Sequence, residues 1–385
     1  MNAGTDTAPV VIIGSGCIGA AIAYHLGRRG VKDVVVIERE LQSGAGSTGR
    51  CAGGIRQQFS TAVNVRLAQR SVKAFERFAE EMDTGETFWP VGYLFLISDP
   101  EQWTAFQNQA RLQCDLGVDV RVMEPRQALD LVPELNLDGV LGATFCPTDG
   151  LGDPHMITHG FEARARQLGT KFRFGVEALG LQMEGGRVTG VRTSQGDVAT
   201  PVVVNAAGPH AAQVAAWAGV DVPVQPYRRH CFTTAPLPFV HDRLPMIVDM
   251  KSGVYMHRES GGMLLGLADK DEPPSFDLSV NWDFLEKVVE PAMERLPALE
   301  AAEINNAWAG LYETTPDHNA ILGPPAGVEG FLLANGFSGH GFMMCPGVGE
   351  VIAGWIVDGR PPFDVSELRL ERFQERAALV ESNVI

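Results

Sequence analysis

The sequence predicts an α/β fold in which a Rossmann-like dinucleotide-binding domain is joined to a second domain. The first observation is that residues 10–38 have the pattern of a strand, a glycine-rich turn, a helix and a second strand. The second is that residues 332–359 repeat the order of strand, glycine loop and helix. The third is the length of 385 residues, because a single hydrophobic core rarely grows beyond about 250–300 residues. We therefore expect two domains, one of them built on a parallel sheet.

The first glycine-rich turn has the spacing that a dinucleotide pyrophosphate needs. "VVII" is typical of a short buried parallel strand, and "CIGAAIAYHLGRRG" after it has helical periodicity. In the GxGxxG turn between them, Gly14 permits a tight turn, Gly16 lets the backbone approach the phosphates, and Gly19 lets helix and strand pack closely. The N-terminus of the helix then supplies amide donors and partial positive charge. The second strand, "VVVIE", ends at Glu38, which can accept both hydroxyls of an adenosine ribose.

A second glycine-rich stretch bears on which dinucleotide binds. Glu38 disfavours NADP, because a carboxylate repels a 2′-phosphate, but NAD and FAD both fit the first turn. "ERELQSGAGSTGRCAGGIRQQFS" follows the second strand and holds five glycines between Ser43 and Ser60. A flavin needs more backbone contacts than NAD, so this stretch favours FAD. A flexible loop is the alternative, but the amphipathic run "AVNVRLAQRSVKAFERFAEEM" after it indicates an ordered helix entry.

The late glycine segment, "LLANGFSGHGFMMCPGVGEVIAGWIVDG", predicts a second helix N-terminus near Gly341. Such a terminus stabilises negative charge. A reduced flavin carries negative charge around N1 and C2=O, so a helix dipole aimed there would raise its electron affinity. A loop histidine bonded only to backbone is the alternative interpretation of His340.

The remaining chain predicts further strands and helices. "FWPVGYLFLIS" is strand-like, and "EQWTAFQNQARLQCDLG" and "WDFLEKVVEPAMERL" are predicted helices. "ALGLQMEGGRVTGVRTSQG" is a predicted hairpin with a Gly-Gly turn. Asp153 before Pro154 is expected to cap a structural helix in "GLGDPHMITHGFEARARQLG".

Composition excludes several classes of partner. The net charge is −16, whereas nucleic-acid binding needs clustered Lys and Arg. The six cysteines are scattered without a CxxC pair, which indicates neither a metal site nor a disulfide framework. "MNAGTDTAP" lacks the pattern of a signal peptide, and no run of 18 apolar residues occurs. We therefore expect a cytoplasmic protein with no membrane span.

Six stretches together carry a family resemblance: "VVIIGSGCIGAAIAYHLGRRG", "VVVIERE", "GAGSTGRCAGGIRQQFS", "VVNAAGPHA", "AGLYETTPDHNAILG" and "NGFSGHGFMMCPGVGEVIA". With these motifs the sequence resembles the D-amino-acid-oxidase-type FAD-dependent oxidoreductases, in particular the branch of sarcosine oxidase, glycine oxidase and the dye-linked L-proline dehydrogenase β-subunit. The resemblance runs from about residue 9 to about residue 360. It implies a Rossmann-like FAD-binding domain interleaved with an antiparallel-sheet α+β substrate domain.

The resemblance also implies which residues contact FAD. The first turn would meet the pyrophosphate, Glu38 and Arg39 would hold the adenosine, and Val176 would read the adenine through its backbone. The implied set is Gly14, Gly16, Ile18, Gly19, Glu38, Arg39, Ser47, Thr48, Arg50, Cys51, Ala52, Gly53, Val176, Ala206, Ala207, Gly208, Gly339, His340, Gly341, Phe342 and Met343.

For the substrate, the resemblance implies a small amino acid whose carboxylate is held by Arg56. Arginine offers a two-pronged fork matched to a carboxylate, and pairing with a neighbouring acid is the alternative. Tyr255, His257 and Tyr312 are expected to line the pocket, because side chains on a strand alternate between two faces. A buried core or surface position is the alternative for each.

Departures from the monomeric sarcosine oxidase pattern refine the expectation. Gly310 stands where that branch has the cysteine that bonds FAD, and Arg50 stands near a covalent histidine of dimethylglycine dehydrogenase relatives, so we expect non-covalent FAD. Met343 replaces a lysine that helps to hold the carboxylate. Leu264 falls about where the branch has a lysine that assists oxygen reduction, which favours a dehydrogenase over a fast oxidase.

The expected function is hydride transfer to the flavin from the C–N carbon of a secondary or N-methyl amino acid, sarcosine- or proline-like, with an imine as product. The alternatives are a primary amine or D-amino-acid oxidase, and a non-catalytic flavin-containing subunit or assembly factor. The electron acceptor stays open among a quinone, a dye, an electron-transfer protein and oxygen, as does membership of a hetero-oligomer. The expected division of the chain is 1–85, 146–220 and 313–365 for FAD, 86–145 and 221–312 for substrate, and 366–385 as a tail without an assigned role.

Overall fold

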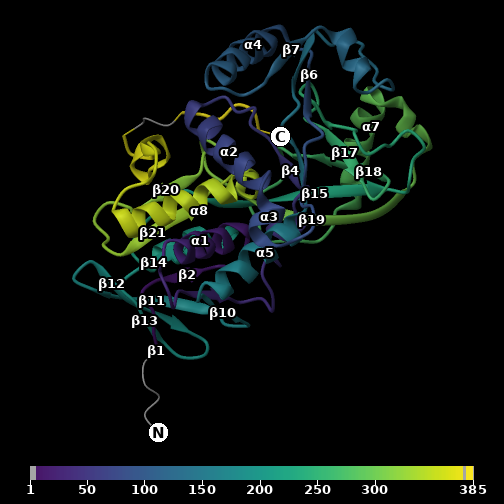
Figure 1. The fold of residues 1–385 in the computed structure, drawn as a ribbon. Helices are drawn as coiled ribbons and strands as arrows, with labels where there is room; N and C mark the ends of the chain where they lie inside the picture. The colour runs from purple at the N-terminus through teal and green to yellow at the C-terminus, as the bar shows by residue number, and fades with distance from the viewer. Residues whose placement is uncertain (1–5, 376–378, 385) are drawn as a thin grey trace.

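The computed structural model describes residues 6–375 and 379–384 and is built around a six-stranded sheet (Figure 1). The strand order is β10-β3-β2-β14-β21-β20, and all neighbours are parallel except the last pair. The strands are β2 (Val11–Ile13), β3 (Val35–Glu38), β10 (Lys171–Phe174), β14 (Val203–Asn205), β20 (Ile321–Gly323) and β21 (Phe331–Asn335). Parallel strands buried on both faces explain why these segments are almost continuously apolar.

Helices cover one face of this sheet and a smaller sheet covers the other. Ile12 belongs to the core on the helical side, whereas Val11 and Ile13 belong to the core on the opposite side, as alternation along a strand requires. On the helical side lie α1 (Cys17–Arg28), α2 (Ala62–Phe75), α3 (Phe78–Met82), α5 (Pro154–Gln167) and α8 (Gly341–Asp358). On the other side lie β1 (Asp6–Thr7), β11 (Ala178–Glu184), β12 (Arg187–Thr193), β13 (Val198–Ala199) and α6 (Ala211–Ala216).

An eight-stranded sheet of order β19-β15-β18-β17-β16-β6-β8-β7 forms the second half of the molecule. Only the β16–β6 pair is parallel. Its strands are β6 (Tyr93–Ile97), β7 (Arg121–Met123), β8 (Gly142–Cys146), β15 (Gln225–Thr234), β16 (Met246–Asp249), β17 (Tyr255–Glu259), β18 (Gly262–Leu267) and β19 (Ile304–Thr314). Helix α7 (Leu285–Arg295) packs on one face, and α4 (Pro100–Asp115) packs on the face that also carries Tyr93 and Tyr255. A small sheet of β4 (Gly54–Ile55), β5 (Phe88–Trp89) and β9 (Gly150–Gly152) completes the described strands.

The mixed α/β fold predicted from the sequence is confirmed. The predicted hairpin is β11–β12 with Gly185 and Gly186 at its turn, and the Asp153 carboxylate caps α5 by accepting two backbone N–H groups. The amphipathic run expected to enter one helix forms two, α2 and α3, separated at Glu76 and Arg77. The boundaries between the two expected domains stay a prediction.

The end of the chain has more structure than its sequence indicated. Two short 3-10 turns, Ser366–Leu368 and Leu370–Phe373, precede the described segment 379–384. Arg372 in the second turn forms a buried ion pair with Asp317, whose carboxylate oxygens lie 2.7 and 3.0 Å from its guanidinium nitrogens. Within the described ranges, no helix has the length and apolarity needed to cross a membrane.

Candidate active site

A long cavity of about 290 Å³ lies where the carboxyl ends of β2, β3, β14 and β21 meet the eight-stranded sheet. This is the edge at which open α/β sheets bind their ligands. The long cavity is walled by the β2–α1 turn, the end of β3, the loop 46–52, residues 176–178 and 206–210, strands β15, β17 and β19, and the start of α8.

The glycines of the β2–α1 turn are required by close backbone contacts. A Cβ at Gly14 would lie 2.3 Å from the Ala206 carbonyl oxygen, and the φ of Gly14 is +105°. A Cβ at Gly19 would lie 2.0 Å from the Gly14 carbonyl oxygen. Gly19 is not part of the lining of the long cavity, and its role is to allow the turn to form. Gly16, the N-cap of α1, has no side chain to bond the first amides, and Thr48 accepts from the Cys17 N–H instead. The start of α1 from Gly16 to Ile18 lines the cavity with the partial positive charge of a helix N-terminus.

The Glu38 carboxylate is held in the wall of the long cavity by backbone donors. One oxygen accepts from the Ser15 N–H at 2.8 Å and the other from the Glu40 N–H at 3.0 Å. A carboxylate has about four lone-pair positions, so acceptor capacity is left for a ligand hydroxyl. This arrangement fits an adenosine ribose.

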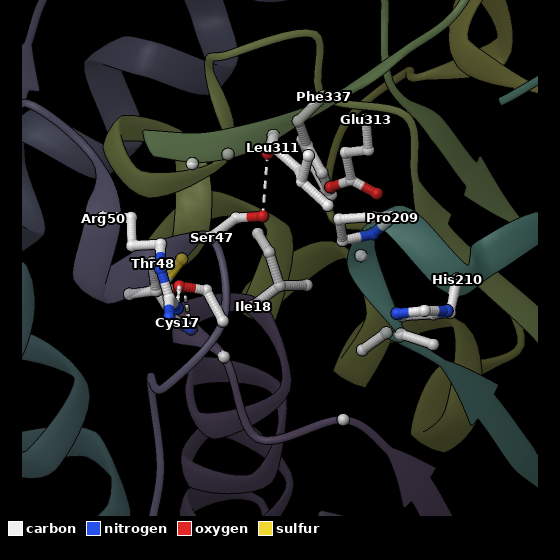
Figure 2. A pocket seen from close by; sticks show the side chains of 18 of the residues that line it. Cys17, Ile18, Ser47, Thr48, Arg50, Pro209, His210, Leu311, Glu313 and Phe337 are labelled. Carbon is white, nitrogen blue, oxygen red and sulfur yellow. Dashed lines mark hydrogen bonds between the residues drawn. The ribbon is translucent and has the colours of Figure 1, made fainter. Parts of the chain in front are cut away.

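Two hydroxyl groups form hydrogen bonds that fix the wall of the long cavity at its middle (Figure 2). The Thr48 Oγ1 accepts from the Cys17 N–H at 3.1 Å, and the Ser47 Oγ donates to the Leu311 carbonyl oxygen at 2.7 Å. The second bond joins the loop of the six-stranded half to β19 of the eight-stranded half. Opposite them in the same view, Glu313 reaches into the cavity, where burial raises its pKa to about 7.

The structure brings most of the expected cofactor residues together in this wall. Those that line the long cavity are Gly14, Gly16, Ile18, Glu38, Arg39, Ser47, Thr48, Arg50, Cys51, Ala52, Val176, Ala206, Ala207, Gly208, Gly339, Gly341 and Phe342. Gly53, His340 and Met343 instead line a smaller neighbouring cavity. Gly339 and Phe342, at the start of α8, line both spaces, and the N-cap residue His340 makes no side-chain capping bond.

The inner cavity, as we call this smaller space, has a volume of about 40 Å³ and shares part of its wall with the long cavity. Room for a few water-sized positions suits a small ligand. Its lining residues are Cys51, Ala52, Gly53, Gly54, Arg56, Tyr93, Met246, Tyr255, Tyr312, Gly339, His340, Phe342 and Met343.

Three of the five tyrosines of the chain line the inner cavity, and each lies against a glycine. A Cβ at Gly54 would lie 2.1 Å from the Tyr93 side chain, and a Cβ at Gly266 would lie 2.1 Å from the Tyr255 side chain. A Cβ at Gly339 would lie 2.4 Å from the Tyr312 ring. Burial raises the pKa of each phenol, that of Tyr312 to about 12. The phenols therefore keep their protons at neutral pH and offer O–H donors rather than a base.

Arg56 is the charged group of the inner cavity and is only 1% exposed. Its guanidinium donates to the carbonyl oxygens of Gln58 and Asn383 and to His340 Nε2, the last at 3.0 Å. It also lies 4.1 Å from the centre of the Phe59 ring. Among the described residues, Nε has no hydrogen-bond partner and no carboxylate forms an ion pair with Arg56.

Among the described residues two other arginines are fully buried, and each of them is paired with a carboxylate. Arg295 forms an ion pair with Asp249 at 2.9 Å and Arg372 forms one with Asp317 at 2.7 Å. Asp149, a buried acid near Arg56, accepts from Gln57 and Gln58 instead. The charges of Glu381 and Asp149 act on Arg56 from nearby, but no described carboxylate contacts it. Because a buried charge is costly unless it is directly paired, Arg56 can still gain from a ligand anion.

His340 is neutral in this arrangement. Burial, together with the charge of Arg56, lowers its pKa well below the usual value. Since a guanidinium has no acceptor, Nε2 must accept from Arg56 and the ring proton belongs on Nδ1. His340 thus orients Arg56 and lines the inner cavity without adding a second charge.

Other expected residues lie elsewhere. His257 faces the same side of β17 as Tyr255, but about 6.6 Å further along the strand; it lines neither cavity, and its Nδ1 contacts the Arg258 carbonyl at 2.7 Å. Leu264 is buried among apolar side chains and also lines neither cavity. A Cβ at Gly310 would lie 3.0 Å from the Arg50 Cβ, so these two positions are neighbours.

Sequence reasoning missed several lining residues. Tyr93 and Met246 lie on the paired strands β6 and β16, and only the strand-like run around Tyr93 could have pointed to it. Arg229 lines the long cavity from β15, with its guanidinium carbon 5.4 Å from the Tyr312 ring centre. Arg229 and Cys231 are two residues apart on β15, so both side chains face the cavity. The sequence could have predicted this pair only if the face of β15 that lines the cavity had been known.

Comparison with known proteins agrees with this geometry. The family model described as "FAD dependent oxidoreductase" matches residues 9–355. The mitochondrial dimethylglycine dehydrogenase of Rattus norvegicus is 32% identical over 96% of this chain, which spans only 45% of that protein's length. The FAD-dependent oxidoreductase domain-containing protein 1 of Xenopus laevis is 31% identical over 99% of the chain and 85% of its own length. The crystal structure of L-proline dehydrogenase from P. horikoshii superposes with a TM-score of 0.91 at 35% identity, covering 97% of this chain and 100% of that one.

The long cavity has what FAD requires: a tight glycine turn that a Cβ would disrupt, two helix N-termini at its wall and a carboxylate with free acceptor capacity. The family match covers these elements from the first glycine turn to α8. The chain belongs to the family of FAD-dependent oxidoreductases, and FAD is its cofactor.

Proposed function

We propose that the chain oxidises the C–N bond of a small secondary or N-methyl amino acid, sarcosine- or proline-like, to an imine. The observation that carries the proposal is Arg56, a buried guanidinium without a carboxylate in contact, in a cavity that shares part of its wall with the cofactor cavity. The printed names of two relatives, dimethylglycine dehydrogenase and L-proline dehydrogenase, support an amino acid with a substituted nitrogen.

In this proposal Arg56 binds the substrate carboxylate and fixes the direction of the amine. The rings of Tyr93, Tyr255 and Tyr312 enclose the apolar part and exclude water. Their positions leave the reacting carbon on the side of the shared wall, toward the long cavity. The volume of the inner cavity, about 40 Å³, restricts the substrate to a small amino acid.

Bound FAD supplies the acceptor for the hydride that leaves the carbon next to the nitrogen. The nitrogen lone pair then forms the C=N bond, so the amine must be neutral when it reacts. Because the phenols of the inner cavity keep their protons, none of them serves as the base. An apolar enclosure next to the cation Arg56 disfavours an ammonium group, which lowers the pKa of the bound amine.

We also propose non-covalent FAD and an electron acceptor other than oxygen. Gly310 has no side chain to bond the cofactor, and the Arg50 guanidinium donates to the carbonyl oxygens of Ala45 and Gly46. Leu264 brings no charge to either cavity. A cytoplasmic location and a partner subunit stay predictions.

Anaerobic bleaching of the flavin absorbance tests the proposal. The purified protein is mixed with sarcosine, L-proline, D-proline, dimethylglycine, glycine and D-alanine, and is then exposed to air. We expect one secondary or N-methyl amino acid to bleach the flavin and air to restore it slowly. Bleaching by glycine or D-alanine alone would make the chain a primary amine oxidase, and rapid recolouring would refute the argument from Leu264. Bound FAD that no amine bleaches would leave the non-catalytic subunit as the better interpretation.

A further inference from the structure

The described C-terminal segment, residues 379–384, returns to the centre of the molecule beside β4, where its yellow trace meets the early part of the chain (Figure 1). Two of its side chains are buried, since Glu381 is 0% and Asn383 1% exposed. Ser382 between them is exposed. A short segment without regular structure is therefore anchored at two points behind Arg56.

Glu381 is the first anchor, and its carboxylate collects donors from the start of α2. It accepts from the Ser60 N–H at 2.9 Å, from the Ser60 hydroxyl at 2.7 Å and from Asn64 Nδ2 at 3.0 Å. It also accepts from the Asn383 N–H of its own segment at 3.0 Å. A carboxylate satisfied by this many donors is fixed in place, and it fixes the backbone of Asn383 with it.

Asn383 is the second anchor and contacts Arg56 directly. Its carbonyl oxygen accepts from Arg56 Nη2. Its Nδ2 donates at 3.3 Å to the Gln58 carbonyl, the same oxygen that accepts from Arg56 Nη1. The segment therefore contributes one acceptor to Arg56 and supports a second.

The donors of Arg56 divide into a held set and a free set. A guanidinium has five N–H groups. Nη2 uses its two on His340 and Asn383, and Nη1 uses one on Gln58. Nε–H and the second Nη1 hydrogen are left. They lie on different edges of the planar guanidinium, so one of them can meet a carboxylate oxygen while the held donors fix the group.

We propose that Glu381 and Asn383 are positioning residues of the substrate site, which hold Arg56 so that one of its free donors faces an incoming carboxylate. The inference rests on the proposed role of Arg56 and deepens it. Without the segment, Arg56 would lose an acceptor and regain rotamer freedom that binding must then remove. Residues that orient metal ligands change affinity or activity about 10-fold to 100-fold when altered, and by analogy we expect an effect of about 10-fold here.

The test uses the full-length holoenzyme with Glu381→Gln, whose amide N–H₂ opposes the donors of Ser60 and Asn64. Ser382→Ala is the matched control, because that side chain lies on the same segment and bonds only to Gln109 and the Asn383 side chain. Binding of acetate and 2-furoate is measured by calorimetry, with the FAD content and the melting temperature of each variant. We expect Glu381→Gln to raise the Kd of both anions about 10-fold at unchanged FAD content, and Ser382→Ala to match the wild type.

A second readout separates positioning from general destabilisation. Anaerobic flavin reduction is compared for L-proline against pyrrolidine, and for sarcosine against dimethylamine. A positioning role predicts that Glu381→Gln weakens the amino acid of each pair and spares the amine that lacks a carboxylate. Equal loss for both members of a pair, or unchanged anion binding, would overturn the inference while the role of Arg56 stands.

Two further outcomes are decisive. If Glu381→Gln fails to fold, Asn383→Ala replaces it, because this variant keeps the carbonyl and loses the bond to Gln58 and the long contact with the Ser382 hydroxyl, which Ser382→Ala controls for. A few-fold rise in Kd supports the inference and no rise refutes it. If wild-type holoenzyme binds neither anion yet oxidises an amine, the anchoring role of Arg56 fails and this inference with it, whereas the oxidation of amines stands.

Discussion

Replacing Gly266 with alanine should displace Tyr255 from the wall shared by the two cavities. Gly266 on β18 is paired with Tyr255 on β17, and a Cβ at Gly266 would lie 2.1 Å from the Tyr255 Cζ and 2.2 Å from its hydroxyl oxygen. The φ of Gly266 is not in the positive range, so alanine brings no backbone strain. The whole effect must therefore come from the contact with the ring.

The magnitude follows from how tightly the ring is held. Tyr255 is 5% exposed, and extra methyl groups in a packed core typically cost about 1–3 kcal/mol. Tyr255→Ala alone should cost roughly 3–5 kcal/mol, as for other large aromatic truncations. In the double variant the alanine methyl at 266 no longer meets a ring, so the two effects should miss additivity by about 1–3 kcal/mol, with the double variant more stable than the sum.

Denaturant unfolding of the four proteins gives this coupling energy, and steady-state kinetics give its functional counterpart. We expect Gly266→Ala to lower kcat/KM at least about 10-fold, because a shifted ring misaligns the substrate. Gly85→Ala is the control, since a Cβ there meets only the Met156 Cε at 3.6 Å. Free energies that add within about 0.5 kcal/mol, or an unchanged kcat/KM, would refute the reasoning.

Three further outcomes are expected. Gly14→Ala should abolish FAD retention on a desalting column, because its Cβ would lie 2.3 Å from the Ala206 carbonyl oxygen at a φ of +105°; a full flavin complement would contradict this. Arg56→Lys should raise KM for the amino acid roughly 10-fold or more with a smaller change in kcat, because an ammonium lacks the planar fork, and an unchanged KM would remove Arg56 from the carboxylate site. Burial raises the pKa of Asp149 to about 6 from 3.8, so the folded state holds a proton that the unfolded state has lost. Stability should therefore fall by up to about 3 kcal/mol as the pH rises from about 4 to 6. Asp149→Asn should flatten that part of the curve in denaturant titrations at pH 4.5 and 6.5 relative to wild type, and parallel curves would show that Asp149 does not carry the effect.

The parts of the structure that could be predicted are those whose signal lies in a short stretch. The first glycine turn is such a case, because Gly14 and Gly19 contact backbone within the same strand–helix unit or directly beside it. The Asp153 cap is another, since its carboxylate accepts from the backbone N–H groups of His155 and Met156, which lie within three residues of it. The start of α8 at Gly341 was predicted for the same reason.

The inner cavity could not be predicted in full because it joins segments that are distant in sequence. Tyr93 reaches the inner cavity because β6 pairs with β16. Phe95 lies two residues further on the same face of β6, and nothing in the local sequence shows that Tyr93 lines the cavity and Phe95 does not. His257 shares a face with Tyr255, but the cavity ends before it. Alternation gives the face of a strand, whereas the register between strands decides which residue on that face meets the cavity.

The role of the last described residues was also hidden from sequence reasoning. Segment 379–384 has no regular structure and therefore no sequence periodicity. From the sequence, Glu381 cannot be distinguished from the other charged residues of the tail. Only its partners, Ser60 and Asn64 at the start of α2, show that it is buried.

The electrostatics of the site explain how an acidic chain can bind an acid. A net charge of −16 repels anions at a distance, but salt screens exposed charges beyond about 8–10 Å. Arg56 lies inside that range of any ligand in the inner cavity and is itself shielded from solvent. Its acceptors are two carbonyls and a neutral histidine, which stabilise the charge without cancelling it. A substrate carboxylate would neutralise the charge of Arg56. Because the guanidinium is desolvated when the protein folds, ligand binding does not have to desolvate it again, and this favours the bound state. Substrate KM should for this reason depend little on ionic strength, whereas an exposed arginine in the same role would lose affinity as salt rises.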